Sequence, residues 1–147
     1  MPSHHETRHL PHSPEALHAL VLDVMRYPEF LPWCKAARIL ERHQGYFLAE
    51  LVISFKGITE SYVSKVTPRV DDTGHHIDVA LVRGPFKHLH NRWHFTPAPQ
   101  GGCMVDFALD FALKYAWMDA VLGTLFAKAT EKMVSAFSAR AQSMLNA

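Results

Sequence analysis

The sequence predicts an α+β fold in which a curved antiparallel sheet of about seven strands wraps around one long C-terminal helix. Between residues 103 and 113, apolar side chains alternate with polar or small ones, the period of a strand with one buried face. From about Tyr115 to Leu145, apolar residues recur at helical spacing. A helix of that length spans about 45 Å at roughly 1.5 Å per residue. It needs a broad sheet to lie on, which predicts one layer of helix against one of strands.

The first forty residues predict a strand and an amphipathic helix. A weak strand pattern covers residues 5–10. Ser13 then precedes Pro14, a favourable N-cap followed by proline at the first helical position. The helix should run to about Met25 and end at Tyr27-Pro28. The segment YPEFLPWC at 27–34 has two prolines and three aromatics, which predicts a short helical turn or a loop.

The middle of the chain predicts a meander of strands. Segments rich in Gly, Pro and Asp separate alternating stretches, and we expect strands at 36–43, 46–55, 58–67, 75–82, 87–96 and 103–113. Short connections make sequential strands antiparallel neighbours. The expected inner faces are rich in leucine and aromatics, and they include Phe47, Leu51, Ile53, Phe55, Leu89, Trp93 and Phe95.

Composition is that of one globular domain covering residues 1–147, with an apolar fraction of 48%. Fifteen Lys and Arg against 14 Asp and Glu give a formal charge of +1, which argues against DNA as a partner. Cys34 and Cys103 form no CxxC motif, and either a single disulfide or two free thiols fits them. The start has no signal-peptide core, and no apolar run reaches 18 residues. We therefore expect a cytoplasmic, bacterial protein.

Aromatic residues gather at the connections as well as at the strand centres. Each one alone is explained by packing against the long helix. Together, Tyr27, Phe30, Trp33, Phe86 and Trp93 predict the mouth of a ligand cavity, because loops seldom carry such residues unless they close over something.

Five segments resemble the coenzyme Q-binding protein family called COQ10. They are YPEFLPWC at 27–34, ESYVSKVTP at 60–68, GPFKHLHNRWHF at 84–95, VDFALDF at 105–111 and KMVSAFSARA at 132–141. That family belongs to the START-like (SRPBCC) superfamily with the helix-grip fold, and its bacterial members overlap with ribosome association toxins. The resemblance implies that ubiquinone or a similar polyprenyl lipid binds between sheet and helix. It also implies delivery to respiratory or biosynthetic machinery without chemical change.

The residues supply what a quinone with an isoprenoid tail requires, namely an apolar groove, aromatic faces and one or two donors. We expect the groove to be lined by Leu89, Trp93, Phe95, Phe107, Leu109, Phe111, Leu122, Phe126 and Met133. Tyr62 or Lys87 would donate to a headgroup oxygen, unless Tyr62 lies at the solvent edge and Lys87 is a solvated loop cation.

Two loops are expected to form the mouth. They are Gly84–Lys87 and Tyr27–Trp33, whose apolar residues Phe30, Leu31, Trp33 and Phe86 should meet a membrane surface. Lys87 would add attraction to anionic lipid by about 1 kcal/mol at most, so the contact should be weak and reversible. This places the protein at the periphery of the inner membrane.

Three rival functions have weaker support. His88, His90 and His94 share one strand face but lack a carboxylate partner for a zinc site, so we expect neither metal nor cofactor. A cyclase would need paired acid and base groups, which Glu60, Asp106 and Asp110 do not offer. A ribosome-binding regulator would need a basic surface. Its candidate cations are dispersed along the chain: Lys35, Arg38, Arg42, Lys65, Arg69, Lys87 and Arg92. The sequence therefore predicts a lipid-binding protein that is not an enzyme.

Overall fold

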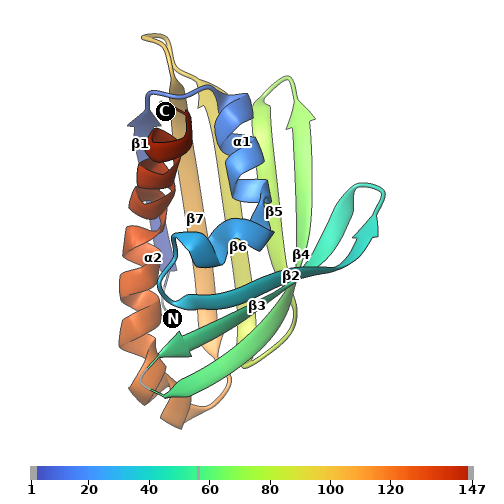
Figure 1. Cartoon of the computed structure of the whole chain (residues 1–147), viewed down its shortest axis with the longest axis vertical. Helices are drawn as coiled ribbons and strands as arrows, with labels where there is room; N and C mark the ends of the chain where they lie inside the picture. The colour runs from blue at the N-terminus through green and yellow to red at the C-terminus, as the bar shows by residue number, and fades with distance from the viewer. Residues whose placement is uncertain (1–2, 56, 146–147) are drawn as a thin grey trace.

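The computed structural model describes residues 3–55 and 57–145; the side chains of residues 55, 121, 122, 125, 126 and 145 fall outside the described part. The elements follow one another as β1 (Ser3–Leu10), α1 (Pro14–Leu22), a 3-10 helix η1 (Val24–Glu29), β2 (Cys34–His43), β3 (Tyr46–Phe55), β4 (Ile58–Asp71), β5 (Gly74–Arg83), β6 (Phe86–Pro97), β7 (Cys103–Leu113) and α2 (Ala116–Leu145). The strands form one antiparallel sheet in the order β1-β7-β6-β5-β4-β3-β2 (Figure 1).

The helices cover one face of the curved sheet. In Figure 1, α2 lies against β1 and β7, while α1 packs on β5 and β6. Strands β2 to β7 form the expected meander, and β1 returns beside β7, with Ser3 opposite Asp110 and Leu10 opposite Cys103. The predicted α+β helix-grip architecture is confirmed.

The first helix begins where the sequence predicts and ends earlier. Ser13 caps α1 by accepting a hydrogen bond from the Ala16 backbone N–H at 3.2 Å, and Pro14 opens the helix. The helix stops at Leu22 because Asp23 leaves helical geometry at φ −82° and ψ 65°. The chain then tightens into η1, which continues through Pro28. The prediction of one helix to Met25 was therefore wrong.

Strand β4 is longer than predicted. It passes through Pro68, which pairs with Ile77 of β5. Pairing with β3 ends at Val66, because β3 begins at Tyr46. Beyond that point no described strand pairs with β4 on that side, so a proline without a backbone N–H costs no ladder bond there.

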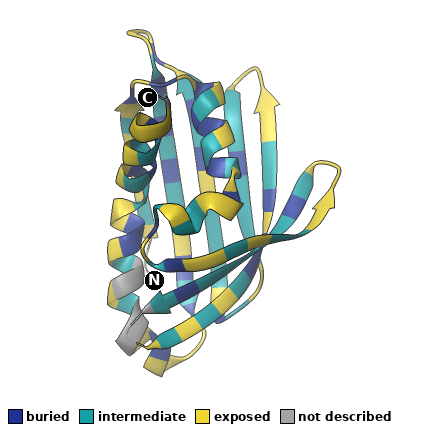
Figure 2. Ribbon diagram, in the orientation of Figure 1, coloured by how far each residue is buried: buried dark blue, intermediate teal, exposed yellow. Residues whose placement is uncertain are grey.

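The core lies between the inner face of the sheet and the helices, and buried positions alternate along the central strands in Figure 2. On β7 the alternation is regular, with Val105, Phe107, Leu109 and Phe111 buried. Cys34 and Cys103 are both buried free thiols. Within the described residues, no helix is long and apolar enough to cross a membrane.

Candidate functional site between the sheet and the helices

Two adjoining cavities lie on the inner face of the sheet, with volumes of about 70 and 60 Å³. Both are lined by Tyr27, Leu51, Asn91 and Trp93. The first extends to Leu31, Trp33, Cys34, Ile53, Met133 and Phe137. The second extends to Val21, Val24, Ala49, Ser64, Val66, Ile77 and Val79. The lining is therefore mostly apolar, with a few polar groups from η1, β4 and β6.

Trp93 forms the aromatic wall shared by the two cavities. Its ring is 4.6 Å from that of Phe107 and 5.2 Å from that of Phe137, and it stacks on Phe95 at 5.9 Å with 9° between the planes. Only 4% of Trp93 is exposed. Such offset and edge-on contacts stabilise aromatic clusters beyond their buried area. The wall is thus fixed from the sheet on one side and from α2 on the other.

Asn91 is the polar residue at the junction of the cavities. Its Oδ1 accepts a hydrogen bond from Trp93 Nε1 at 2.9 Å, and its Nδ2 donates to the Ala108 carbonyl at 2.9 Å. A side-chain amide has two N–H groups and two lone pairs, so one donor and one acceptor remain for a ligand. Asn91 is not among the site residues predicted from the sequence. The signal was an amide on the otherwise apolar face Leu89-Asn91-Trp93-Phe95.

Three further polar groups lie close together in this interior. Burial raises the pKa of Tyr27 and of Tyr62 above the ordinary 10.0, and the neighbouring Cys34 contributes to both shifts. Burial raises the pKa of the Cys34 thiol to about 11. Tyr27 donates its hydroxyl proton to the Val21 carbonyl. All three groups are uncharged near neutral pH, which suits a ligand with polar oxygens and no charge.

The contact between η1 and α2 closes one side of the cavities. Phe137 of α2 lies 5.2 Å from the Tyr27 ring and 5.1 Å from the Phe30 ring. Arg140 sits over the Phe30 ring at 5.1 Å and forms an ion pair with Glu29. These five residues define the η1–α2 contact.

The predicted groove residues divide into two groups. Leu31, Trp33, Trp93 and Met133 line the cavities. Other predicted residues contribute to the hydrophobic core without lining either cavity: Leu89, Phe95, Phe107, Leu109 and Phe111. The side chains of Leu122 and Phe126 lie outside the described residues. Of the two predicted donors, Tyr62 points inward against Phe86 at 5.3 Å, whereas Lys87 is exposed.

The expected surface position of Phe86 was wrong. Only 4% of it is exposed, and its ring packs against Tyr62 and, at 6.2 Å, against Phe111. Phe86 pairs with Leu113 while His88 pairs with Ala112, so an irregularity at the start of β6 keeps Phe86 on the inner face. Leu31 is buried as well. These two residues therefore offer nothing to a membrane surface.

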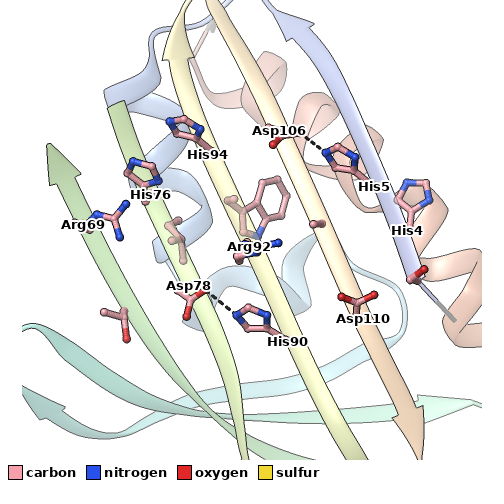
Figure 3. Close-up of a pocket in the computed structure, with 15 residues that line it drawn as sticks. His4, His5, Arg69, His76, Asp78, His90, Arg92, His94, Asp106 and Asp110 are labelled. Atoms are coloured by element: carbon pink, nitrogen blue, oxygen red, sulfur yellow. Dashed lines mark hydrogen bonds and ion pairs between the residues drawn. The ribbon is translucent and has the colours of Figure 1, made fainter. Parts of the chain in front are cut away.

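The outer face of the sheet carries a separate open hollow of about 890 Å³ with polar walls (Figure 3). Within it, His5 pairs with Asp106 at 2.6 Å and His90 with Asp78 at 2.8 Å. His94 bonds instead to the Thr73 carbonyl, at 2.8 Å. The described residues contain no cluster of three or more His, Cys, Asp or Glu that could hold a metal. The hollow suits polar contacts rather than a lipid tail.

Known proteins share both the sequence pattern and the architecture of this chain. A family model described as polyketide cyclase/dehydrase and lipid transport matches residues 10–138. The chain belongs to this family. It is 39% identical over 146 residues to the ribosome association toxin RatA of Rickettsia prowazekii, with 99% of each chain covered.

Two further matches extend the comparison. The chain is 30% identical over 142 residues to the mitochondrial coenzyme Q-binding protein COQ10 homolog B of Xenopus laevis, covering 92% of this chain and 56% of that one. The predicted resemblance to COQ10-like proteins that overlap with ribosome association toxins is confirmed. The Zhui aromatase/cyclase of Streptomyces sp. R1128 superposes with a TM-score of 0.79 at 17% identity, over 96% of this chain and 93% of that one. It shares the fold.

Proposed function

We propose that the protein binds ubiquinone or a related polyprenyl lipid between the sheet and the helices and carries it unchanged for respiration or quinone biosynthesis. The observation that carries this proposal is the Asn91 amide, held at the junction of two apolar cavities beside the Trp93 ring. A quinone ring fits between aromatic faces and needs donors for its carbonyl oxygens. Asn91 is a suitable donor that lines both cavities, whereas Tyr62 packs against Phe86 and lines neither.

The cavity lining favours transport over chemistry. Among the described residues that line either cavity there is no carboxylate and no imidazole. Proton transfer to or from a bound polyketide needs an acid or base within hydrogen-bond reach, most often a histidine or a carboxylate. The titratable groups that do line the first cavity, Tyr27 and Cys34, have pKa values raised by burial, which makes them poor bases near neutral pH. The similarity to a protein named as coenzyme Q-binding supports the same choice of function.

Binding requires the interior to open. Ligand cavities commonly hold about 300–1,000 Å³, whereas the two cavities measure about 70 and 60 Å³. The η1–α2 contact is the wall whose displacement would join them and admit a tail. Its ion pair is half exposed at Glu29, and exposed pairs contribute only about 0–1 kcal/mol. The closed wall is therefore held mainly by its aromatic contacts.

The test is a search for bound lipid followed by a titration. Protein purified from a quinone-producing host is analysed by native mass spectrometry and lipid extraction, and short-tailed ubiquinone is then titrated by tryptophan fluorescence. Asn91→Leu should weaken binding about tenfold, the loss expected for one hydrogen bond in a dry site. Arg92→Gln is the matched control, because Arg92 is exposed on the other face of the same strand. Quinone-free protein that fails to bind added ubiquinone, or equal affinity in all three proteins, would contradict the proposal.

A second candidate function is association with ribosomes. It rests on the 39% identity with a ribosome association toxin over nearly the whole of both chains. Two predicted cations are neutralised, because Arg38 pairs with Glu50 and Arg69 with Asp71. Others gather where the β2–β3 hairpin projects from the sheet (Figure 1), with Lys65 over the Tyr46 ring at 4.5 Å and Arg42 over Phe47 at 5.9 Å.

Sedimentation of ribosomes tests the second candidate independently of the lipid. The protein is added to ribosomal subunits under conditions in which they associate, and the fraction of joined ribosomes is measured. Wild type should lower that fraction, and Arg42→Glu combined with Lys65→Glu should restore it, while Asn91→Leu should act like wild type. An unchanged fraction with wild type would dismiss this candidate.

A further inference from the structure

Two aromatic side chains are exposed where the sheet passes into the long helix. Tyr115 is 52% exposed and Trp117 is 55% exposed, and they are the two aromatics among the large exposed apolar residues in the described part of the chain. Both lie beside the helical stripe that buries Met118. Each residue therefore presents about half of its surface to solvent.

Three cations lie at the same corner. The Lys114 backbone N–H donates to the Pro85 carbonyl at 2.7 Å, which ties the start of α2 to the turn between β5 and β6. That turn carries exposed Arg83 and Lys87, and Lys114 is exposed too. The described ion pairs of arginine and lysine involve other residues: Arg8, Arg26, Arg38, Arg69 and Arg140. Asp119 is the acidic residue in the first turn of α2, so the corner has an excess of positive charge.

This combination matches one kind of surface. Tryptophan and tyrosine favour the boundary between lipid headgroups and hydrocarbon, because each has an apolar ring and a polar edge. Exposed lysine and arginine beside such rings attract anionic headgroups, each strengthening binding about fivefold near the bilayer. Protein interfaces are also rich in tyrosine, tryptophan and arginine but are depleted in lysine, and two of the three cations at this corner are Lys87 and Lys114.

We infer that the β7–α2 corner, defined as Arg83, Lys87, Lys114, Tyr115 and Trp117, docks on the surface of an anionic bilayer. The corner lies at the lower end of the molecule in Figure 1, at the opposite end from the β4–β5 hairpin. Docking there places the start of α2 against the membrane and leaves the β4–β5 hairpin in solvent. This docking surface is separate from the ligand cavities, because none of its five residues lines either of them.

Flotation with quinone-free vesicles tests the docking surface. Wild type is mixed with phosphatidylcholine vesicles that contain or lack phosphatidylglycerol, at low salt and at about 0.15 M salt. We expect wild type to float with the anionic vesicles only, and more strongly at low salt. Tyr115→Ser with Trp117→Ser should reduce binding at least tenfold, and Lys87→Glu with Lys114→Glu should abolish the preference for anionic lipid.

A matched control distinguishes binding through the corner from non-specific binding to vesicles. Val70 is 62% exposed on β4 near the far end, so Val70→Ser with Lys35→Glu removes one exposed apolar side chain and one exposed cation elsewhere. This control should float like wild type. Wild type that stays with no vesicle, or corner variants that float like wild type, would overturn the inference. A wild-type dimer in sedimentation equilibrium, with the serine variant monomeric, would also overturn the inference, because the corner would then be a contact between two copies of the chain. Because the vesicles hold no quinone, failure of the proposed lipid carriage leaves the expected result unchanged.

Discussion

The hydrogen bond between Asn91 and Trp93 allows a quantitative test of how the cavity is built. Trp93 Nε1 donates to Asn91 Oδ1 at 2.9 Å in an interior where Trp93 is almost fully buried. Asn91→Leu removes the acceptor and leaves a buried indole N–H without a partner, which costs about 1–3 kcal/mol of unfolding free energy. Trp93→Phe removes the donor and also creates a void, so its cost should be at least as large.

The unfolding free energy of the double variant, Asn91→Leu with Trp93→Phe, decides the test. With both substitutions neither partner of the Trp93–Asn91 hydrogen bond remains, and the loss of the Asn91 bond to Ala108 is common to both Asn91 variants. The double variant should therefore be more stable than the sum of the two single losses predicts, by about 1–2 kcal/mol. Urea unfolding followed by circular dichroism measures all four proteins. Arg92→Gln combined with Trp93→Phe is the control pair and should be additive, because Arg92 is exposed. Additivity of the Asn91 pair within about 0.5 kcal/mol would refute this account of the hydrogen bond.

Three other outcomes are expected. Burial lowers the pKa of His18 below its ordinary 6.5, so the unfolded chain binds the proton more tightly and the free energy of unfolding falls as pH drops through 6.5. His18→Gln should therefore lose less stability than wild type between neutral and mildly acidic pH. An unchanged dependence of the unfolding free energy on pH would contradict this. Gly84→Ala should destabilise the fold far more than Gly57→Ala in thermal unfolding, since an added Cβ meets β4 at 2.5 Å at Gly84 (φ +152°) and nothing within 4 Å at Gly57 (φ +80°); equal losses would refute the close approach. Burial raises the pKa of Cys34 and of Cys103 to about 11, so neither thiol should react with iodoacetamide at mildly alkaline pH until the protein unfolds. Labelling of the folded protein, measured by mass spectrometry, would contradict this.

The fold was predictable because it depends on periodicity. Alternation along β7 and the Ser13-Pro14 cap are local signals, and both held in the structure. The end of α1 was not predictable from the apolar pattern, because it is set by the backbone turn at Asp23. The predicted strand at 58–67 is too short for a related reason, since whether a strand can continue through a proline such as Pro68 depends on where the neighbouring strand ends.

The site was predictable only in part. A strand pattern assigns faces, so Trp93 was correctly placed inside, but it does not show which inner residues leave a cavity between them. Asn91 was not predicted because the sequence does not show which partners a single amide on an apolar strand face will bond, and those partners are Trp93 and Ala108. Phe86 was assigned to the surface because it follows a Gly-Pro turn, while an irregularity in pairing with β7 turns it inward.

The pairing of β1 with β7 has a consequence for how the chain folds. Its contacts join residues about a hundred positions apart, as in the bond from His5 to Asp106. During synthesis the first strand has no partner until β7 has left the ribosome, so completion of the sheet waits for nearly the whole chain. Such distant pairing makes folding slow, on the order of milliseconds to seconds. Until β1 arrives, β7 presents an open edge with a strongly apolar face, which exposes the nascent protein to intermolecular strand pairing.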